Sequence, residues 1–199
     1  ALQKPDGGVR GIVVGEALRR VVAKTLAKQF CKDFEEACCP FQFALSTRAG
    51  VDCGALLCRL LSEEDDSRVI SSLDGIGAYD HVYRSAFFAE LRADPELSAM
   101  LPFVRLWYGR QSHYTWTDEN GTDHRISQGE GVEQGDPLAP LLFSLAIHRA
   151  LRNAHAFLEE VRVHSDAVLL RDNHFRFFDS FGGVVGAIWE SRSVLANAK

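Results

Sequence analysis

Residues 128–138 read QGEGVEQGDPL, and the apolar stretch APLLFSL follows at 139–145. The glycines let the backbone approach a ligand closely. Pro137 predicts the start of a helix that continues through Leu141, Leu142, Leu145 and Leu151. The N-terminus of such a helix carries a partial positive charge that favours phosphate or carboxylate groups. Taken alone, however, the stretch is better explained as an ordinary glycine-rich loop with a helix cap.

A second informative stretch, SLDGIGAYD at 72–80, follows the predicted strand 68–74. Asp74 ends that strand and precedes a tight turn into a predicted helix. A carboxylate in this position suits a divalent cation, because hard cations prefer oxygen ligands, and two-metal phosphoryl transfer needs such carboxylates. The plainer alternative is that Asp74 caps the following helix.

A third stretch, KPDGGVR at 4–10, places Lys4 and Arg10 on either side of a predicted turn. Together these cations could grip a triphosphate, with Arg10 acting as a bidentate fork. A solvated turn is the commoner outcome for a run of this kind.

The remaining pattern predicts alternating helices and short strands. Apolar spacing predicts helices at 16–32, 51–62 and 101–108 and a helix after Tyr79. We expect a strand at 11–14, an extended connector at 39–45, a hairpin with arms 114–117 and 124–126, and a strand at 161–170. Beyond Asp172 no element is assigned. The chain is expected to form one αβ body.

Composition is ordinary for a globular protein, with 46% hydrophobic and 25% charged residues. The net charge of −5 is low for a nucleic-acid binder, yet residues 4–32 carry seven Lys or Arg against two acids. The five cysteines have no disulfide or zinc spacing, so we expect reduced, mostly buried thiols. No apolar run reaches the length of a membrane span, and the first residue, Ala1, favours a fragment.

The order of these segments resembles the reverse transcriptases of retrotransposons without long terminal repeats and related intron-type enzymes. Five segments carry the likeness over residues 3–152: KPDGGVRGI at 4–12, LRRVVAK at 18–24, PFQFALSTRAG at 40–50, LDGIGAYD at 73–80, and QGDPL at 134–138 with PLLF at 140–143. No single segment is decisive, but five in the family's order are difficult to obtain by chance. A glycine, Gly11, replaces the proline that commonly follows the arginine of the first segment.

The resemblance implies a role for each matching residue. Asp74 would bind Mg²⁺, with Mn²⁺ as an alternative, beside the Gly75 carbonyl. Tyr79 would select deoxynucleotides by clashing with a ribose 2′-hydroxyl, and Gln134 and Gly135 would line the nucleotide pocket. Lys4 and Arg10 would hold the incoming phosphates, while Asp80 would be structural. The implied partners are an RNA template, a DNA primer and deoxynucleoside triphosphates, and the implied location is nuclear or otherwise intracellular rather than secreted.

The family's third signature, an aromatic residue, a variable one and two adjacent aspartates, is degenerate here. The adjacent pair Asp65-Asp66 precedes Asp74, and no such pair follows the QGDP segment. Asp166 in HSDAVLL is our first candidate for the second catalytic and metal-binding carboxylate, ahead of Glu159 in AFLEEV. Glu159 also continues a helical pattern, which favours a surface helix. True absence of the site is the third alternative.

We therefore expect an α+β fold: a right-hand polymerase fragment whose short antiparallel palm sheet packs on helices. Partial fingers and connector helices would occupy residues 1–62 and the palm residues 63–172, with 173–199 unassigned. The thumb and other domains of a longer polyprotein would be missing. The expected function is RNA-directed DNA synthesis by two-metal phosphoryl transfer. The alternatives are a catalytically dead polymerase-like fold that only binds nucleic acid or a partner protein, and an unrelated magnesium enzyme that uses Asp74 and Asp136.

Overall fold

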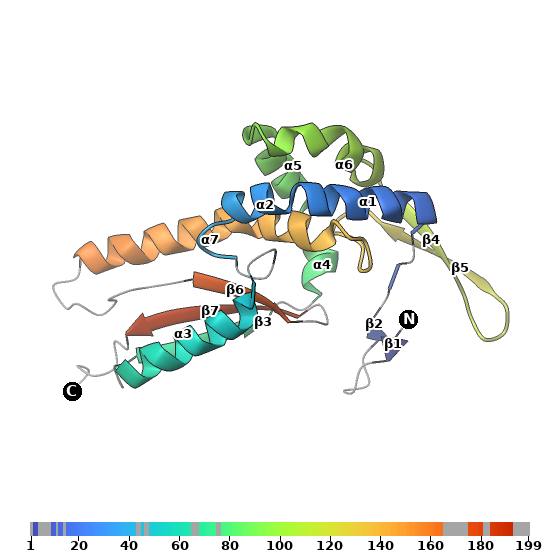
Figure 1. Ribbon diagram of the computed structural model, residues 1–199. Coiled ribbons are helices and arrows are strands. Elements are labelled where there is room, and N and C mark those ends of the chain that lie inside the picture. Colours follow the sequence, from blue (N-terminus) through green and yellow to red (C-terminus); the bar gives the residue numbers. More distant parts are fainter. Residues whose placement is uncertain are drawn as a thin grey trace. The chain divides into compact units, whose positions relative to one another are not determined.

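The computed structural model describes residues 2–3, 9–10, 12–13, 15–42, 45, 48–64, 68–74, 77–164, 175–180 and 184–192 (Figure 1). The chain divides into two compact units, one formed by Ala1–Asp33 with Gly77–Ala146 and the other by Phe34–Ile76 with Ile147–Lys199. Two helices, α2 (Cys31–Ala37) and α7 (Ala139–His164), continue from one unit into the other.

The first unit combines short helices with two antiparallel strand pairs. Its strands are β1 (Leu2–Gln3) with β2 (Val9–Arg10), and β4 (Ser112–Thr117) with β5 (Asp123–Gln128). Its helical elements are α1 (Ala17–Gln29), α4 (Ala78–His81), α5 (Arg84–Ala93), the 3₁₀ turn η1 (Leu97–Met100), α6 (Leu101–Tyr108) and the start of α7.

The core of this unit follows from the apolar spacing of α5, η1 and α6. Phe87 and Leu91 are four residues apart on α5 and are fully buried, as are Leu97 and Val104. The chain turns between α5 and α6 because the Asp94 carboxylate accepts hydrogen bonds from the Glu96 and Leu97 amides. These apolar residues form part of the buried core of the first unit.

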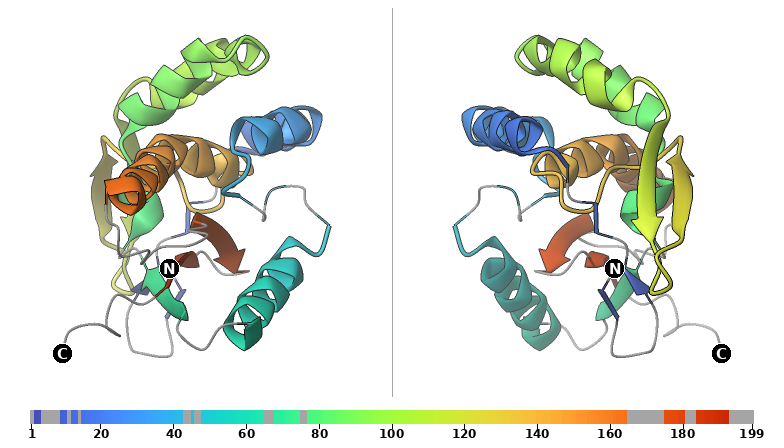
Figure 2. Two further views of the ribbon diagram at one scale, coloured as in Figure 1. Left: turned by 90° about the vertical axis from the view of Figure 1, so that its left-hand side faces the viewer. Right: turned by 90° about the vertical axis from the view of Figure 1, so that its right-hand side faces the viewer.

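The hairpin β4–β5 forms where the sequence predicts it, and Figure 2 shows it as a two-stranded ribbon. Tyr114 pairs with Ile126 and Trp116 with His124. The turn is closed by the Asp118 carboxylate, which accepts hydrogen bonds from the Asn120 and Thr122 amides.

The second unit contains a three-stranded antiparallel sheet in the order β3–β7–β6, built from β3 (Arg68–Asp74), β6 (Phe175–Ser180) and β7 (Val184–Arg192). Helix α3 (Gly50–Glu64) contacts β3 and β6 (Figures 1 and 2). In the β3–β7 register, Asp74 lies opposite Gly186.

The mixture of helices with small antiparallel sheets confirms the expected α+β class, and the predicted elements at 51–62, 68–74, 101–108 and the hairpin are confirmed. The predicted strand at 161–170 is wrong over residues 161–164, which continue α7. No glycine or proline lies between 141 and 170 to end that helix.

Three further expectations also differ from the structure. The first strand lies at Val9–Arg10, and residues 12–13 are not in a strand. Residues 38–41 form a turn within the expected extended connector. Strands β6 and β7 occupy part of the unassigned tail, where aromatic and β-branched residues flank Gly182-Gly183.

Cys31, Cys38, Cys39 and Cys53 are free thiols, as expected, but Cys39 and Cys53 are exposed rather than buried. In the part of the chain that the structure describes, none of the helices combines the length and apolar character that a membrane span requires.

A buried histidine lies in the second unit. The ring of Phe41 lies 5.7 Å from that of His148 and 5.5 Å from that of His155. The Nδ1 atom of His148 is buried without a hydrogen-bond partner among the described residues. Burial, followed by the positive charge of Arg152, lowers the pKa of His148 from its ordinary 6.5, so the folded protein holds this ring neutral.

We predict that His148 makes the protein acid-sensitive. Below about pH 6.5, His148 is protonated in the unfolded chain, whereas its lowered pKa disfavours protonation in the folded chain. The free energy of unfolding therefore falls as the pH decreases below that value. Urea unfolding at pH 7.5 and 5.5 should show a smaller acid loss for His148→Leu than for the wild type. His113→Asn, at an exposed histidine of β4, should leave the loss unchanged. Equal losses in the wild type and His148→Leu would contradict the prediction.

Candidate functional site

The loop between β5 and α7, residues 129–138, is held by backbone hydrogen bonds on two sides. On one side the Gly131 amide donates to the Val82 carbonyl at 2.9 Å, and the Val132 amide donates to the Tyr79 carbonyl at 2.7 Å. On the other, the Val13 amide donates to the Gln134 carbonyl at 2.8 Å. The loop thereby joins the helix that carries Tyr79 to the segment that precedes α1.

Two glycines make these approaches possible. Gly131 has φ +78°, and a Cβ there would lie 2.5 Å from the carbonyl oxygens of both Tyr79 and Asp80. Gly135 has φ +112°, and a Cβ there would lie 2.7 Å from the Val13 oxygen. Both positions therefore need glycine, because glycine adopts positive φ without strain and has no Cβ to collide with these carbonyl oxygens.

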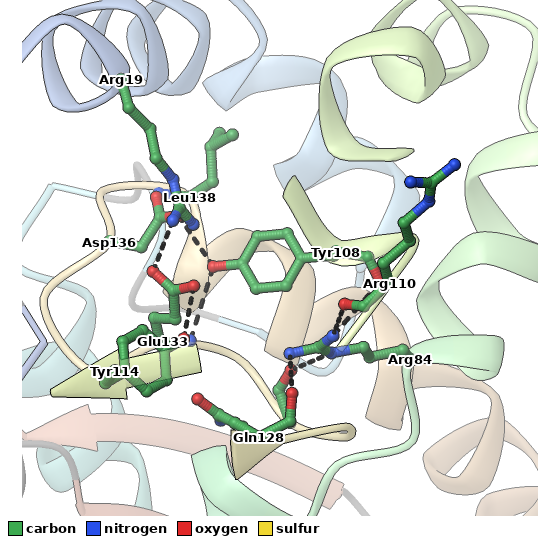
Figure 3. A network of polar contacts seen from close by, with 10 residues as sticks. Arg19, Arg84, Tyr108, Arg110, Tyr114, Gln128, Glu133, Asp136 and Leu138 are labelled. Atoms are coloured by element: carbon green, nitrogen blue, oxygen red, sulfur yellow. Dashed lines mark hydrogen bonds and ion pairs between the residues drawn. The ribbon is translucent and has the colours of Figure 1, made fainter. Parts of the chain in front are cut away.

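A single arginine bridges two carboxylates of this loop. Arg19 of α1 places Nη1 2.8 Å from Glu133 Oε2 and Nη2 2.7 Å from Asp136 Oδ2 (Figure 3). All three side chains are at most 9% exposed. Buried charges of this kind persist only when they are paired and hydrogen-bonded.

Two tyrosine hydroxyls and one amide complete the carboxylate hydrogen bonding. Tyr108 donates to Asp136 Oδ2 at 2.8 Å, and Tyr114 donates to Glu133 Oε1 at 2.6 Å. The Leu138 amide donates to Asp136 Oδ1 at 2.9 Å, which caps the first turn before α7. The two acids exceed the single arginine by one negative charge, and these neutral donors stabilise the excess.

The charge distribution of the cluster changes the pKa of its members. Burial lowers the pKa of the Arg19 guanidinium, but the hydrogen bond and charge of Glu133 and the charge of Asp136 outweigh this effect and raise the pKa above its ordinary value. Burial and then the Asp136 charge raise the pKa of Tyr108. Burial and the hydrogen bond to Glu133 raise the pKa of Tyr114 to about 12. Both tyrosines therefore remain hydroxyl donors at neutral pH.

Arg84 fixes the beginning of the same loop. Its buried guanidinium donates to the Gly131 carbonyl at 3.0 Å and the Arg110 carbonyl at 2.7 Å, with longer contacts to the carbonyls of Tyr108 and Gln128 (Figure 3). The Arg84 amide in turn donates to Glu130 Oε2 at 2.8 Å. The planar guanidinium carries five N–H donors and can bond several separate carbonyls at once. The ammonium of a lysine could not reach all of them.

Of the residues predicted for the site, the structure brings together Tyr79, Gln134 and Gly135. Tyr79 is buried on α4, with its ring centroid 5.0 Å from that of Phe143. Its carbonyl is joined to the loop through Val132, two residues before Gln134. Gln134 is half-buried and Gly135 exposed, so this part of the loop can contact a ligand, and Asp80 is an exposed residue of α4.

The structure describes the other predicted residues only in part. Asp74 ends β3 and Arg10 ends β2, and each is described through its backbone. Lys4, Gly75 and Asp166 lie outside the described residues. Glu159 lies within α7. The strand paired with β3 is β7, so Gly186 is the described neighbour of Asp74.

The described residues include no group of three His, Cys, Asp or Glu side chains that could hold a metal ion. A metal site at Asp74 therefore stays a prediction, and its remaining ligands would have to come from other residues.

Sequence reasoning did not find the Arg19 cluster. Arg19 was noted only as part of the LRRVVAK segment, and Asp136 only as a possible metal ligand. The two are 117 positions apart, and no periodicity links such distant residues. The available signal was the presence of two acids, Glu133 and Asp136, in a glycine-rich loop before an apolar helix, where unpaired charge would be costly.

We predict that Gly131→Ala is far more destabilising than Gly121→Ala. Gly121 has φ +79° with open space around it, so its alanine variant should lose about 1–2 kcal/mol through backbone strain alone. Gly131→Ala adds the clash with the Tyr79 and Asp80 carbonyls and should lose about 3 kcal/mol or more. Denaturant titration measures both, and equal losses would contradict the described packing.

We also predict an alkaline loss of stability that depends on Tyr114. The unfolded chain releases the Tyr114 proton near its ordinary pKa of 10.0, whereas the folded chain holds it to about 12. This contribution is therefore complete below pH 10 and is lost as the pH rises toward 12. Tyr114→Phe should flatten the fall in unfolding midpoint between pH 9 and 11, while Tyr83→Phe, at an exposed tyrosine, should not. If the unfolding midpoint of Tyr114→Phe falls with pH as steeply as that of the wild type, the prediction is contradicted.

Comparison with known proteins supports the resemblance at the level of the reverse transcriptase family. Residues 2–181 match the protein family described as reverse transcriptase (RNA-dependent DNA polymerase). Among curated proteins, no sequence matches the chain. The family match covers most of the 199 residues and includes the whole loop with its arginine-bridged carboxylates. The chain belongs to the reverse transcriptase (RNA-dependent DNA polymerase) family.

Proposed function

We propose that this chain is the fingers–palm part of a reverse transcriptase of the type found in retrotransposons without long terminal repeats. It would add deoxynucleotides to a DNA primer along an RNA template. The observation that carries the proposal is the loop at 129–138, whose backbone joins Tyr79 to Gln134 and Gly135. The family resemblance gives nucleotide-binding roles to all three of these residues.

The proposed nucleotide pocket uses this arrangement. Tyr79 would exclude the ribose 2′-hydroxyl by contact, a role that needs a ring held in place, and burial against Phe143 supplies that restraint. Gln134 and Gly135 would contact the nucleotide and template, and their exposure permits it. Lys4 and Arg10 would hold the phosphates, and of the two the structure describes Arg10, at the end of β2.

Residues 1–62 would form the partial fingers and connector helices, and residues 63–172 the palm. The thumb and other domains that grip the primer and template would belong to a longer polyprotein. A nuclear or other intracellular location accompanies this proposal.

Magnesium is proposed as the cofactor, with Asp74 as one ligand and Asp166 as the preferred second. When bound, the metal would stabilise the attacking and leaving oxygens of the phosphoryl transfer. The end of a β-strand is a rigid place from which a carboxylate can contribute. Glu159 is the weaker candidate, because it lies within α7 rather than in a strand.

A second candidate function is a polymerase-like fold that binds nucleic acid or a partner protein without catalysis. The sequence feature that favours it is the absence of two adjacent aspartates after the QGDP segment. A misplaced carboxylate costs about two orders of magnitude in rate, and the loss of a metal ligand costs more.

Primer extension separates the two candidates. The wild type, Asp74→Ala and the control Glu119→Ala, at the exposed hairpin tip, would be compared on a poly-A template with an oligo-dT primer and Mg²⁺. We expect incorporation by the wild type and by Glu119→Ala, and a loss of at least about 100-fold in Asp74→Ala. Absence of incorporation by wild-type protein that circular dichroism shows to be folded would reject the catalytic function and favour the binding-only alternative.

A further inference from the structure

We propose that Arg19 is a positioning residue for the nucleotide pocket: it holds Gln134 and Gly135 in place by gripping the carboxylates on both sides of them. This inference rests on the proposed function for its catalytic consequence. Its structural part, that Arg19 fixes the loop, stands on the contacts alone.

The loop needs such a restraint because its own backbone is permissive. Gly131 and Gly135 both adopt positive φ, and Gly129 adds a third glycine within seven residues. Glycine-rich segments lose more conformational freedom on ordering than other segments do. The stretch from Glu133 to Asp136 receives one long-range backbone hydrogen bond in the described structure, from Val13 to Gln134.

Arg19 supplies the restraint at both ends of the functional dipeptide. Glu133 immediately precedes Gln134, and Asp136 immediately follows Gly135. The two guanidinium nitrogens contact these carboxylates at 2.8 and 2.7 Å. A rigid planar group that holds the residues on either side therefore fixes the direction of the Gln134–Gly135 backbone.

The guanidinium is itself held in one place. It lies 4.7 Å from the centre of the Trp107 ring and 5.5 Å from that of Tyr108, on α6. Tyr108 also donates to Asp136, so the same ring supports the cation and one of its acids. These stacking contacts favour arginine over lysine, whose ammonium is a point charge without a planar face.

The geometry also connects the dipeptide to the segment that follows Arg10. Val13, three residues after Arg10, bonds to Gln134, and Arg19 lies on the first turn of the helix that comes next. Val13, Arg19, Glu133 and Gly135 line one small hollow on this unit. Displacement of the Arg19 side chain would therefore disturb both the dipeptide and the segment bonded to it.

The test compares Arg19→Met and Arg19→Lys with Lys24→Met, an exposed position on the same helix with the same charge change. Hydrogen–deuterium exchange would follow the Val13 amide and residues 129–138. We expect faster exchange there in both Arg19 variants and wild-type exchange in Lys24→Met. Unchanged exchange in Arg19→Met would overturn the proposal, whatever the activity.

Single-nucleotide incorporation tests the catalytic consequence. Arg19→Lys keeps the positive charge but cannot contact both carboxylates as the guanidinium does, so we expect a folded variant, checked by circular dichroism, with a lower melting temperature than wild type. Its kcat/KM for the incoming nucleotide should nevertheless fall about 100-fold, with an unchanged affinity for primer–template. Wild-type kcat/KM in Arg19→Lys would contradict the positioning role.

The two arms keep the inference separate from the proposed function. A wild type that incorporates no nucleotide contradicts the polymerase function, while faster exchange in the Arg19 variants would still support the restraint on the loop. If the wild type is active and Lys24→Met loses as much kcat/KM as the Arg19 variants do, the loss is a general effect of charge. That result would overturn the inference.

Discussion

The buried guanidinium of Arg19 is the constraint on which the candidate site depends. A cation that is 9% exposed must keep its carboxylates, since removing one partner of a buried pair typically costs about 3–5 kcal/mol. The chain can meet this requirement only when α1, the Glu133–Asp136 segment and α6 come together, because they carry the cation, the acids and the rings that stack on it. The ion pairs of Arg19 thus determine how three segments distant in sequence come together. The buried apolar residues of α5, η1 and α6 form part of the core of the same unit.

The same logic explains why polar and glycine residues are concentrated in one loop. Gly131 lets the backbone touch α4, Arg84 satisfies carbonyls that would otherwise be buried without partners, and the two tyrosines complete the acids. A half-satisfied network would be worse than an apolar core, so these contacts are interdependent. Within this loop Gly135 is exposed and Gln134 half-buried between restrained neighbours, and such restraint is what the proposed nucleotide pocket would require.

Sequence reasoning reached the parts of the structure that local patterns encode. Apolar periodicity located α3 and α6, the turn residues after Asp118 located the hairpin, and the order of five segments indicated the family to which the chain belongs. It failed where the structure is determined by long-range contacts, or by the absence of a residue that would end a helix. Residues 161–164 resemble a strand locally but continue α7 because no glycine or proline ends it. The pairing of β3 with β7 and the pairing of Arg19 with Asp136 join residues more than a hundred positions apart, which a single sequence cannot show.

A double-mutant cycle on Arg19 and Asp136 tests this account most directly. Arg19→Met, Asp136→Asn and the double variant would be compared with wild type by equilibrium denaturation at pH 7. The account predicts that each single change is strongly destabilising and that the double variant loses less than the sum, with a coupling energy of about 1.5–3 kcal/mol. Additive losses, within about 0.5 kcal/mol, would show that the two charges do not depend on one another, and the claim that Arg19 organises the loop would fail.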